Sequence, residues 1–160
     1  MKKFILNLSL IIIVIFSAVN LASAQSQATK GNFGLGVMFG EPTGLSGKLW
    51  TSHTNALDFG LAWSFINDNS ITMTSDYLFH QYNLLKVDQG SLPFYYGIGG
   101  RLLLGNQAKL GVRIPVGLNY LFANDPIGVF FEVAPVLDLV PSTRFDVNGG
   151  IGIRYYFGMK

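Results

Sequence analysis

Residues 55–65 alternate without a break between large apolar side chains and small, polar or charged ones. The large apolar positions are Leu57, Phe59, Leu61, Trp63 and Phe65, and the positions of the other parity are Ala56, Asp58, Gly60, Ala62 and Ser64. Successive side chains of a β-strand point to opposite faces, so the pattern predicts a strand with one apolar and one polar face. Charge on the face of the small residues is the reverse of what a soluble barrel needs. It is typical of a barrel whose outer wall contacts lipid.

The same pattern recurs along the chain in eight segments, which are separated by clusters of turn-forming residues. We expect strands at about 31–40, 44–51, 55–65, 71–84, 94–104, 110–120, 129–139 and 147–157. A tilted strand needs about 9–11 residues to cross the hydrocarbon of a bilayer, and most of these segments are long enough. The predicted fold is therefore an eight-stranded, antiparallel, up-and-down transmembrane β-barrel.

The first residues are typical of a secretory signal peptide. Lys2 and Lys3 give a positive start, an apolar run follows at about 10–16, and Ala22-Ser23-Ala24 forms a small-x-small cleavage site. We expect residues 1–24 to be removed and residues 25–160 to form one exported barrel domain. A retained transmembrane helix is the alternative, although polar residues interrupt the apolar run.

The composition of the exported part narrows the possible classes. The full chain has 11 Lys and Arg residues and 9 Asp and Glu residues. Removal of Lys2 and Lys3 makes the two numbers equal, so the net charge of the exported part is zero. A basic surface for nucleic acid is therefore not indicated. The chain has no cysteine, which excludes disulfides and a lipid anchor on an N-terminal cysteine. Glycines and charges interrupt every later apolar run before it could form a spanning helix. A closed barrel is then the only remaining structure that could span a membrane. Closure of the sheet pairs the backbone N–H and C=O groups that would otherwise face lipid without a hydrogen-bond partner.

All charged residues at the alternating positions of the predicted strands fall on the face of small side chains. The cations are Lys48, Arg101, Arg113 and Arg154, and the anions are Asp58, Asp76, Glu132 and Asp138. A lysine or arginine that faces lipid at the midplane costs about 2–4 kcal/mol, which explains the segregation. Side chains just fill the interior of an eight-stranded barrel, so we predict a paired charge network that closes the lumen. A path for protons, ions or a small solute through the same charges is the functional alternative.

Aromatic residues of the outward parity gather near the ends of the predicted strands, with aliphatic residues between them. They are Phe33, Phe39, Trp63, Phe65, Phe94, Tyr96, Tyr120, Tyr155 and Phe157. Amphipathic rings lie at the headgroup level of a bilayer, so this pattern predicts two aromatic belts. The alternative is the general preference of aromatic residues for strands.

The motifs that could support catalysis or cofactor binding are incomplete. Residues 40–48 resemble a phosphate-binding loop, but Pro42 stands where the first glycine is required, Leu49 replaces the Ser or Thr after the lysine, and no helix follows. The only histidines, His53 and His80, have no neighbouring carboxylates at metal-ligand spacing. Ser75 and Asp76 lie close to His80 in sequence, but Ser75 has the outward parity and His80 the inward one. We therefore expect no catalytic residues, no cofactor and no metal.

The signal peptide, the eight alternating strands, the polar filling and the aromatic last strand (150–157) together resemble small bacterial outer-membrane β-barrels. The nearest types are the transmembrane domain of outer-membrane protein A and the outer-membrane protein X class. The resemblance implies a location in the outer membrane, surrounded by its lipid. It also implies recognition by the outer-membrane assembly machinery, which reads a C-terminal aromatic residue such as Phe157. Both termini would then be periplasmic, together with the longest predicted connection, at about 86–91.

The leading hypothesis for function is a non-enzymatic, monomeric outer-membrane barrel with a structural role or an interaction at the cell envelope. A narrow channel for protons or small solutes is the alternative, and a lipid-modifying outer-membrane enzyme is a third possibility. A soluble periplasmic barrel of the lipocalin type would require apolar residues inside and charges outside, which the alternation opposes.

Overall fold

The computed structural model of the 160-residue chain describes residues 33–41, 43–64 and 70–158. The predicted signal peptide and its cleavage site lie outside the described residues, as does Phe65 of the predicted belts. Over the described ranges, helices of the length and apolarity required to cross a bilayer are absent.

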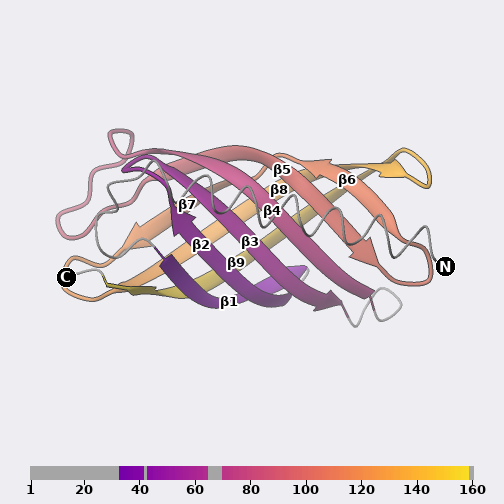
Figure 1. Ribbon diagram of the computed structural model, residues 1–160. Coiled ribbons are helices and arrows are strands. Elements are labelled where there is room, and N and C mark those ends of the chain that lie inside the picture. Colours follow the sequence, from indigo (N-terminus) through magenta and orange to yellow (C-terminus); the bar gives the residue numbers. More distant parts are fainter. Residues whose placement is uncertain (1–32, 42, 65–69, 159–160) are drawn as a thin grey trace.

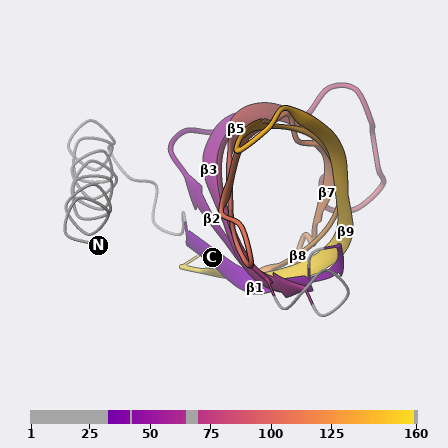
Figure 2. The same ribbon diagram turned by 90° about the vertical axis from the view of Figure 1, so that its right-hand side faces the viewer.

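The described chain folds into one antiparallel sheet that closes on itself (Figure 1). Its strands are β1 (Phe33–Glu41), β2 (Thr43–Trp50), β3 (Asn55–Ser64), β4 (Ser70–Gln81), β5 (Phe94–Leu104), β6 (Lys109–Arg113), β7 (Val116–Leu121), β8 (Ile127–Val140) and β9 (Arg144–Phe157). β1 pairs with β9, which closes the ring, and the view along the barrel shows the two strands side by side (Figure 2). β6 and β7 share one place in the wall, because each pairs with both β5 and β8. The ring therefore has eight strands, and the predicted fold is confirmed.

The predicted sixth strand, 110–120, is the main correction to the element boundaries. It is interrupted between Arg113 and Val116, where Pro115 has no N–H to donate to a neighbouring strand. The carbonyl of Pro115 still accepts a hydrogen bond from the N–H of Gly97, at 2.9 Å. The wall thus stays closed where the regular ladder is broken.

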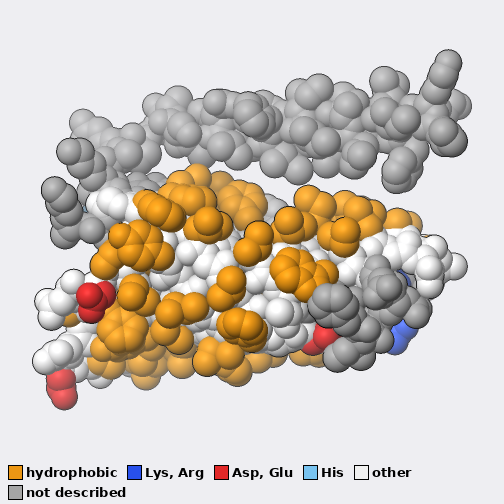
Figure 3. All heavy atoms as spheres, turned by 90° about the horizontal axis from the view of Figure 1, so that it is seen from below, with side chains coloured by type: hydrophobic (Ala, Val, Ile, Leu, Met, Phe, Trp, Pro, Cys, Tyr) orange, Lys and Arg blue, Asp and Glu red, His pale blue; other side chains and the backbone are white. Residues whose placement is uncertain are grey.

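The wall is apolar outside and polar inside. Outward side chains of the strands are largely aliphatic and aromatic; Ile98, for example, is 58% exposed and Ile153 is 46% exposed. Inward charged side chains such as Arg113 are buried. In Figure 3 apolar side chains cover the middle of the visible face, and charged ones appear only toward its two ends. This sidedness follows from the alternation of side chains along each strand.

Glycines on the inner face lie directly across from large inner side chains. Gly34 pairs with Tyr156, and Gly36 pairs with Arg154. A Cβ built on Gly34 would lie 2.6 Å from Cε1 of the Tyr156 ring, and one on Gly36 would overlap the backbone of β9. The small residues of the inward parity therefore provide the space that the long polar side chains fill.

We name the two ends of the barrel by their strands. The terminal end is the one at which Phe33 of β1 pairs with Phe157 of β9, and it also holds the links 51–54, 82–93 and 122–126. The far end holds the links 105–108 and 141–143. Both sets of links are visible at opposite sides of Figure 1.

Candidate functional site

The eight charged residues predicted for the interior are all buried in the structure. Their exposed fractions range from 0% for Lys48 to 6% for Asp58 and Glu132. Each of the eight takes part in at least one ion pair. A buried charge is tolerated only when it is paired and hydrogen-bonded, so the arrangement has a clear physical basis. We call this set, together with the polar residues it contacts, the interior network.

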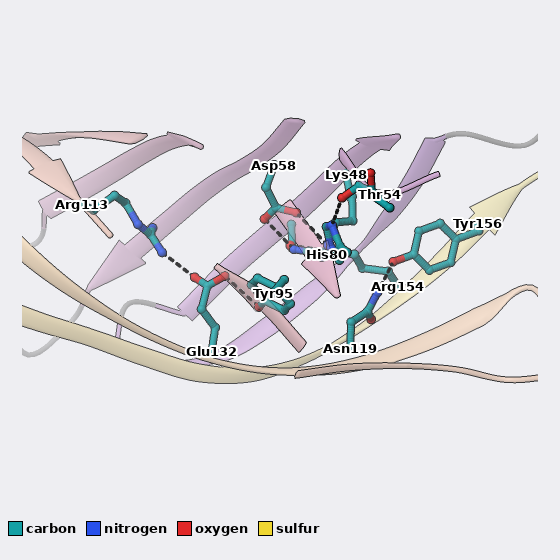
Figure 4. Close-up of polar contacts among 11 residues, drawn as sticks. Lys48, Thr54, Asp58, His80, Tyr95, Arg113, Asn119, Glu132, Arg154 and Tyr156 are labelled. Atoms are coloured by element: carbon teal, nitrogen blue, oxygen red, sulfur yellow. Dashed lines mark hydrogen bonds and ion pairs between the residues drawn. The ribbon is translucent and has the colours of Figure 1, made fainter. Parts of the chain in front are cut away.

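Arg154 lies at the centre of the part of the network nearest the terminal end (Figure 4). Its Nη2 donates to Oδ2 of Asp58 at 2.7 Å, and its Nε and Nη2 donate to Oγ of Ser46 at 2.9 and 2.6 Å. The guanidinium also lies 3.9 Å from the centre of the Phe130 ring, a cation–π contact. Two β-strands separate β9 from β3 in the ring, so this side chain crosses the lumen.

Lys48 occupies a cage of aromatic and polar groups beside that arginine. Its Nζ lies 2.9 Å from Nε2 of His80 and 3.8 Å from Oδ1 of Asp58. It also lies 4.7 Å from the ring centre of Tyr95 and 5.1 Å from that of Trp50. The other ring nitrogen of His80, Nδ1, is 3.1 Å from the carbonyl oxygen of Thr54, which can only accept. This geometry assigns the ring hydrogen to Nδ1 and leaves Nε2 to accept from the ammonium.

A second arginine joins two carboxylates near the middle of the barrel. Arg113 forms an ion pair with Glu132 and places its Nε 3.4 Å from Oδ1 of Asp76. The other oxygen of Glu132 accepts a hydrogen bond from the Tyr95 hydroxyl at 2.9 Å. Because Tyr95 also contacts the Lys48 ammonium, this group and the previous one are continuous.

A third arginine holds the part of the network nearest the far end. Nη2 of Arg101 donates to both oxygens of Asp138 at 2.9 Å, and Nη1 donates to Asp146 at 2.8 Å and to Asn148 at 3.2 Å. Asp146 was absent from the predicted network because the last strand was expected to begin at residue 147. The strand begins at Arg144, and Asp146 has the same inward parity as Asn148. Extending the alternation by one step would have found it.

Several neutral polar residues complete the network and were not predicted as members. Tyr95, His80, Asn119 and Tyr156 are buried, and Nδ2 of Asn119 lies 3.4 Å from the Tyr156 hydroxyl. All four have the inward parity of their strands, which was the available signal. Tyr95 and Tyr156 carry no charge, so a network predicted from charged residues alone does not include them.

Of the residues predicted for the aromatic belts, those that the structure describes lie on the outer wall. They are divided unevenly between the two ends of the barrel. The terminal end holds Phe33, Phe94, Tyr96, Tyr120, Tyr155 and Phe157, whereas the far end holds Phe39 and Trp63. Further outward aromatic rings at the terminal end extend the set. Phe79 stacks on Tyr96 with ring centres 5.6 Å apart, and Phe122 packs edge-on against Tyr120 at 4.8 Å. The terminal end therefore holds most of the described outward aromatic side chains.

The residues considered for catalysis are not brought together. Ser75 is exposed on the outer wall, whereas His80 is buried on the opposite face of β4, and His53 lies in the exposed link 51–54. In the part of the chain that the structure describes, no three His, Asp or Glu side chains are grouped as a metal site would require.

Neither a family model nor a curated protein matches the chain. Among solved structures, the chain is similar to the crystal structure of the N-terminal β-barrel domain of Pseudomonas aeruginosa OprF. The TM-score is 0.56 at 12% sequence identity, and the match covers 80% of this chain and 100% of that one. The similarity supports the predicted barrel fold.

Proposed function

We propose that the protein is a monomeric barrel of the bacterial outer membrane, with a structural role or an interaction at the cell envelope and no catalytic activity. The observation that carries this proposal is the sidedness of the wall. Soluble monomers rarely expose a continuous apolar surface of more than a few hundred Å². An apolar surface around a closed ring, with every charge of the interior network inside, fits hydrocarbon as the surrounding medium.

The interior network supports a closed lumen. Most of its contacts join strands that are not neighbours in the ring: Arg154 of β9 reaches Asp58 of β3, and Tyr95 of β5 reaches Glu132 of β8. Such contacts require side chains to extend across the interior. In an eight-stranded barrel the interior is only wide enough for such a filling.

Two measurements test the membrane barrel. Detergent-purified protein should give a β-rich circular dichroism spectrum and should migrate differently in gels before and after heating, because folded barrels resist detergent. Cell fractionation with protease shaving should place the protein in the outer membrane. A helical spectrum or recovery in the soluble periplasmic fraction would overturn the proposal.

A narrow channel is the second candidate function, and one observation favours it. Several buried network atoms make no hydrogen bond within the described residues, among them Oδ1 of Asp58, Nε of Arg101 and Nη1 of Arg154. Buried polar atoms of this kind commonly bind water, which a proton path needs. Planar-bilayer recordings distinguish the two candidates: a channel conducts, and Arg113→Ala and Glu132→Ala alter its conductance, whereas the closed barrel is silent.

The catalytic alternative has its own test. A lipid-modifying enzyme would change the mass spectrum of outer-membrane lipid A between cells with and without the protein. We expect identical spectra, since Ser75 and His80 lie on opposite faces of β4.

A further inference from the structure

A pocket of about 460 Å³ lies at the far end of the barrel, the end that faces the viewer in Figure 2. Its lining residues are Ser70, Leu103, Gly105, Asn106, Gln107, Lys109, Arg144 and Asp146. They come from β4, β5, β6, β9 and the link 105–108, so the pocket is formed jointly by several hairpins. Its volume is in the range of small-molecule sites.

The charges in this pocket are not balanced among themselves. Lys109 and Arg144 have the inward parity of β6 and β9, and neither forms an ion pair with any described residue. The only acidic lining residue, Asp146, is already paired with Arg101 at 2.8 Å. Arg144 acts electrostatically on Asp146, but this carboxylate is the direct partner of Arg101, so the two cations and one carboxylate that line the site leave it with a net positive charge.

Neutral hydrogen-bond donors line the same pocket as these two cations. Asn106 and Gln107 offer side-chain amides from the link between β5 and β6. Ser70 is 2% exposed, and its hydroxyl makes no hydrogen bond within the described ranges of the chain. This hydroxyl is therefore available to donate a hydrogen bond to a molecule in the pocket.

We propose that this pocket binds a phosphate group, with Lys109 and Arg144 as its charge partners and Asn106, Gln107 and Ser70 as further donors. Phosphate oxygens accept several hydrogen bonds at once and favour a guanidinium and an ammonium together. The group can come from a small phosphate ester in solution or from the phosphorylated headgroup of a lipid at the rim of the barrel. This inference goes beyond the structural role proposed above and does not depend on whether the lumen conducts.

Calorimetric titration of the detergent-purified full-length protein tests the site. The probes are glucose 6-phosphate and, as the uncharged control, glucose. We expect saturable binding of glucose 6-phosphate alone. The variants Lys109→Gln and Arg144→Gln should each weaken it by about tenfold or more, the loss expected for one charge-assisted hydrogen bond. Lys86→Gln, which removes an exposed cation in the link 82–93 at the other end, is the matched control and should leave the affinity unchanged.

Micelles that contain phosphatidic acid separate the two sources of the phosphate. The micelles and inorganic phosphate are compared as competitors of glucose 6-phosphate at equal phosphate concentration. If the micelles displace glucose 6-phosphate at the lower concentration, a lipid headgroup is the preferred ligand. If inorganic phosphate displaces it equally well, the preferred ligand is a soluble ester. Heat-dependent gel migration verifies that each variant is folded. The proposal is overturned if glucose 6-phosphate does not bind saturably, or if folded Arg144→Gln and Lys109→Gln bind it as tightly as the unaltered protein.

Discussion

Arg154 and Asp58 form an ion pair across the barrel lumen, with Nη2 of the guanidinium 2.7 Å from Oδ2 of the carboxylate. The two residues are 96 positions apart in the sequence, and both are buried. Lys48 approaches the other oxygen of the same carboxylate at 3.8 Å. Asp58 therefore serves as the shared counter-charge of two buried cations, which makes it the most consequential single residue of the interior network.

Replacing Asp58 by alanine should destabilise the barrel more than any outward substitution. It leaves Arg154 and Lys48 without their closest carboxylate, and an unpaired buried charge costs about 3–5 kcal/mol. Urea unfolding in lipid vesicles, followed by fluorescence, measures the free energy of unfolding. Asp88→Ala in the exposed link 82–93 is the control and should change it by less than about 0.5 kcal/mol. A loss below about 1 kcal/mol for Asp58→Ala would show that the pair contributes little.

Tyr95→Phe should destabilise the barrel by about 1–3 kcal/mol, because it removes the hydroxyl that donates to the buried carboxylate of Glu132 at 2.9 Å. A double-mutant cycle with Glu132→Gln isolates that interaction, since the loss at Tyr95 should shrink when the carboxylate is already gone. Tyr96→Phe, on the outward parity of the same strand, is the matched control. Equal effects of the two tyrosine variants would contradict the assigned role of Tyr95.

Gly36→Ala should prevent the barrel from folding or weaken it severely. The added Cβ would overlap the backbone of β9 next to Arg154, and backbone of a closed ring has little freedom to move aside. Gly47→Ala on the neighbouring strand β2 is the control, because its nearest neighbouring atom is 3.9 Å from the added Cβ. The fraction of heat-modifiable protein after refolding into detergent measures both. Equal yields for the two variants would mean that the close packing of β1 on β9 is not required.

The two tryptophans should respond differently to lipid-borne quenchers. Trp63 is 42% exposed on the outer wall, whereas Trp50 packs against the inward ring of His80 with ring centres 4.3 Å apart. In vesicles of brominated lipid, Trp50→Phe, which retains Trp63, should be quenched strongly, and Trp63→Phe should be quenched weakly. Stronger quenching of the protein that retains Trp50 would reverse the inferred sidedness of the wall.

The alternation of side chains was sufficient to predict which face each residue occupies. Asp58 and Arg113 lie inside and Phe59 and Ile114 lie on the outer parity, as the segment patterns required. The number of strands in the ring also followed from the turn-forming clusters between the segments. These features are local, because the two-residue period of a strand and the composition of a turn depend on neighbouring residues alone.

The pairing of charges depended on the tertiary structure. Parity places Arg154 and Asp58 on the same face, but it contains no information on the stagger of β9 relative to β3, and that stagger decides which side chains meet. The same holds for the pocket at Lys109 and Arg144, which exists only because separate hairpins end at one height. The interruption at Pro115 could be predicted only in part. The sequence shows that proline lacks an N–H, but it does not show that β5 and β8 pair with the wall on both sides of the interruption. The two-residue period of a strand thus determines which side chains face the lumen. Closure of the ring determines which of them contact one another there.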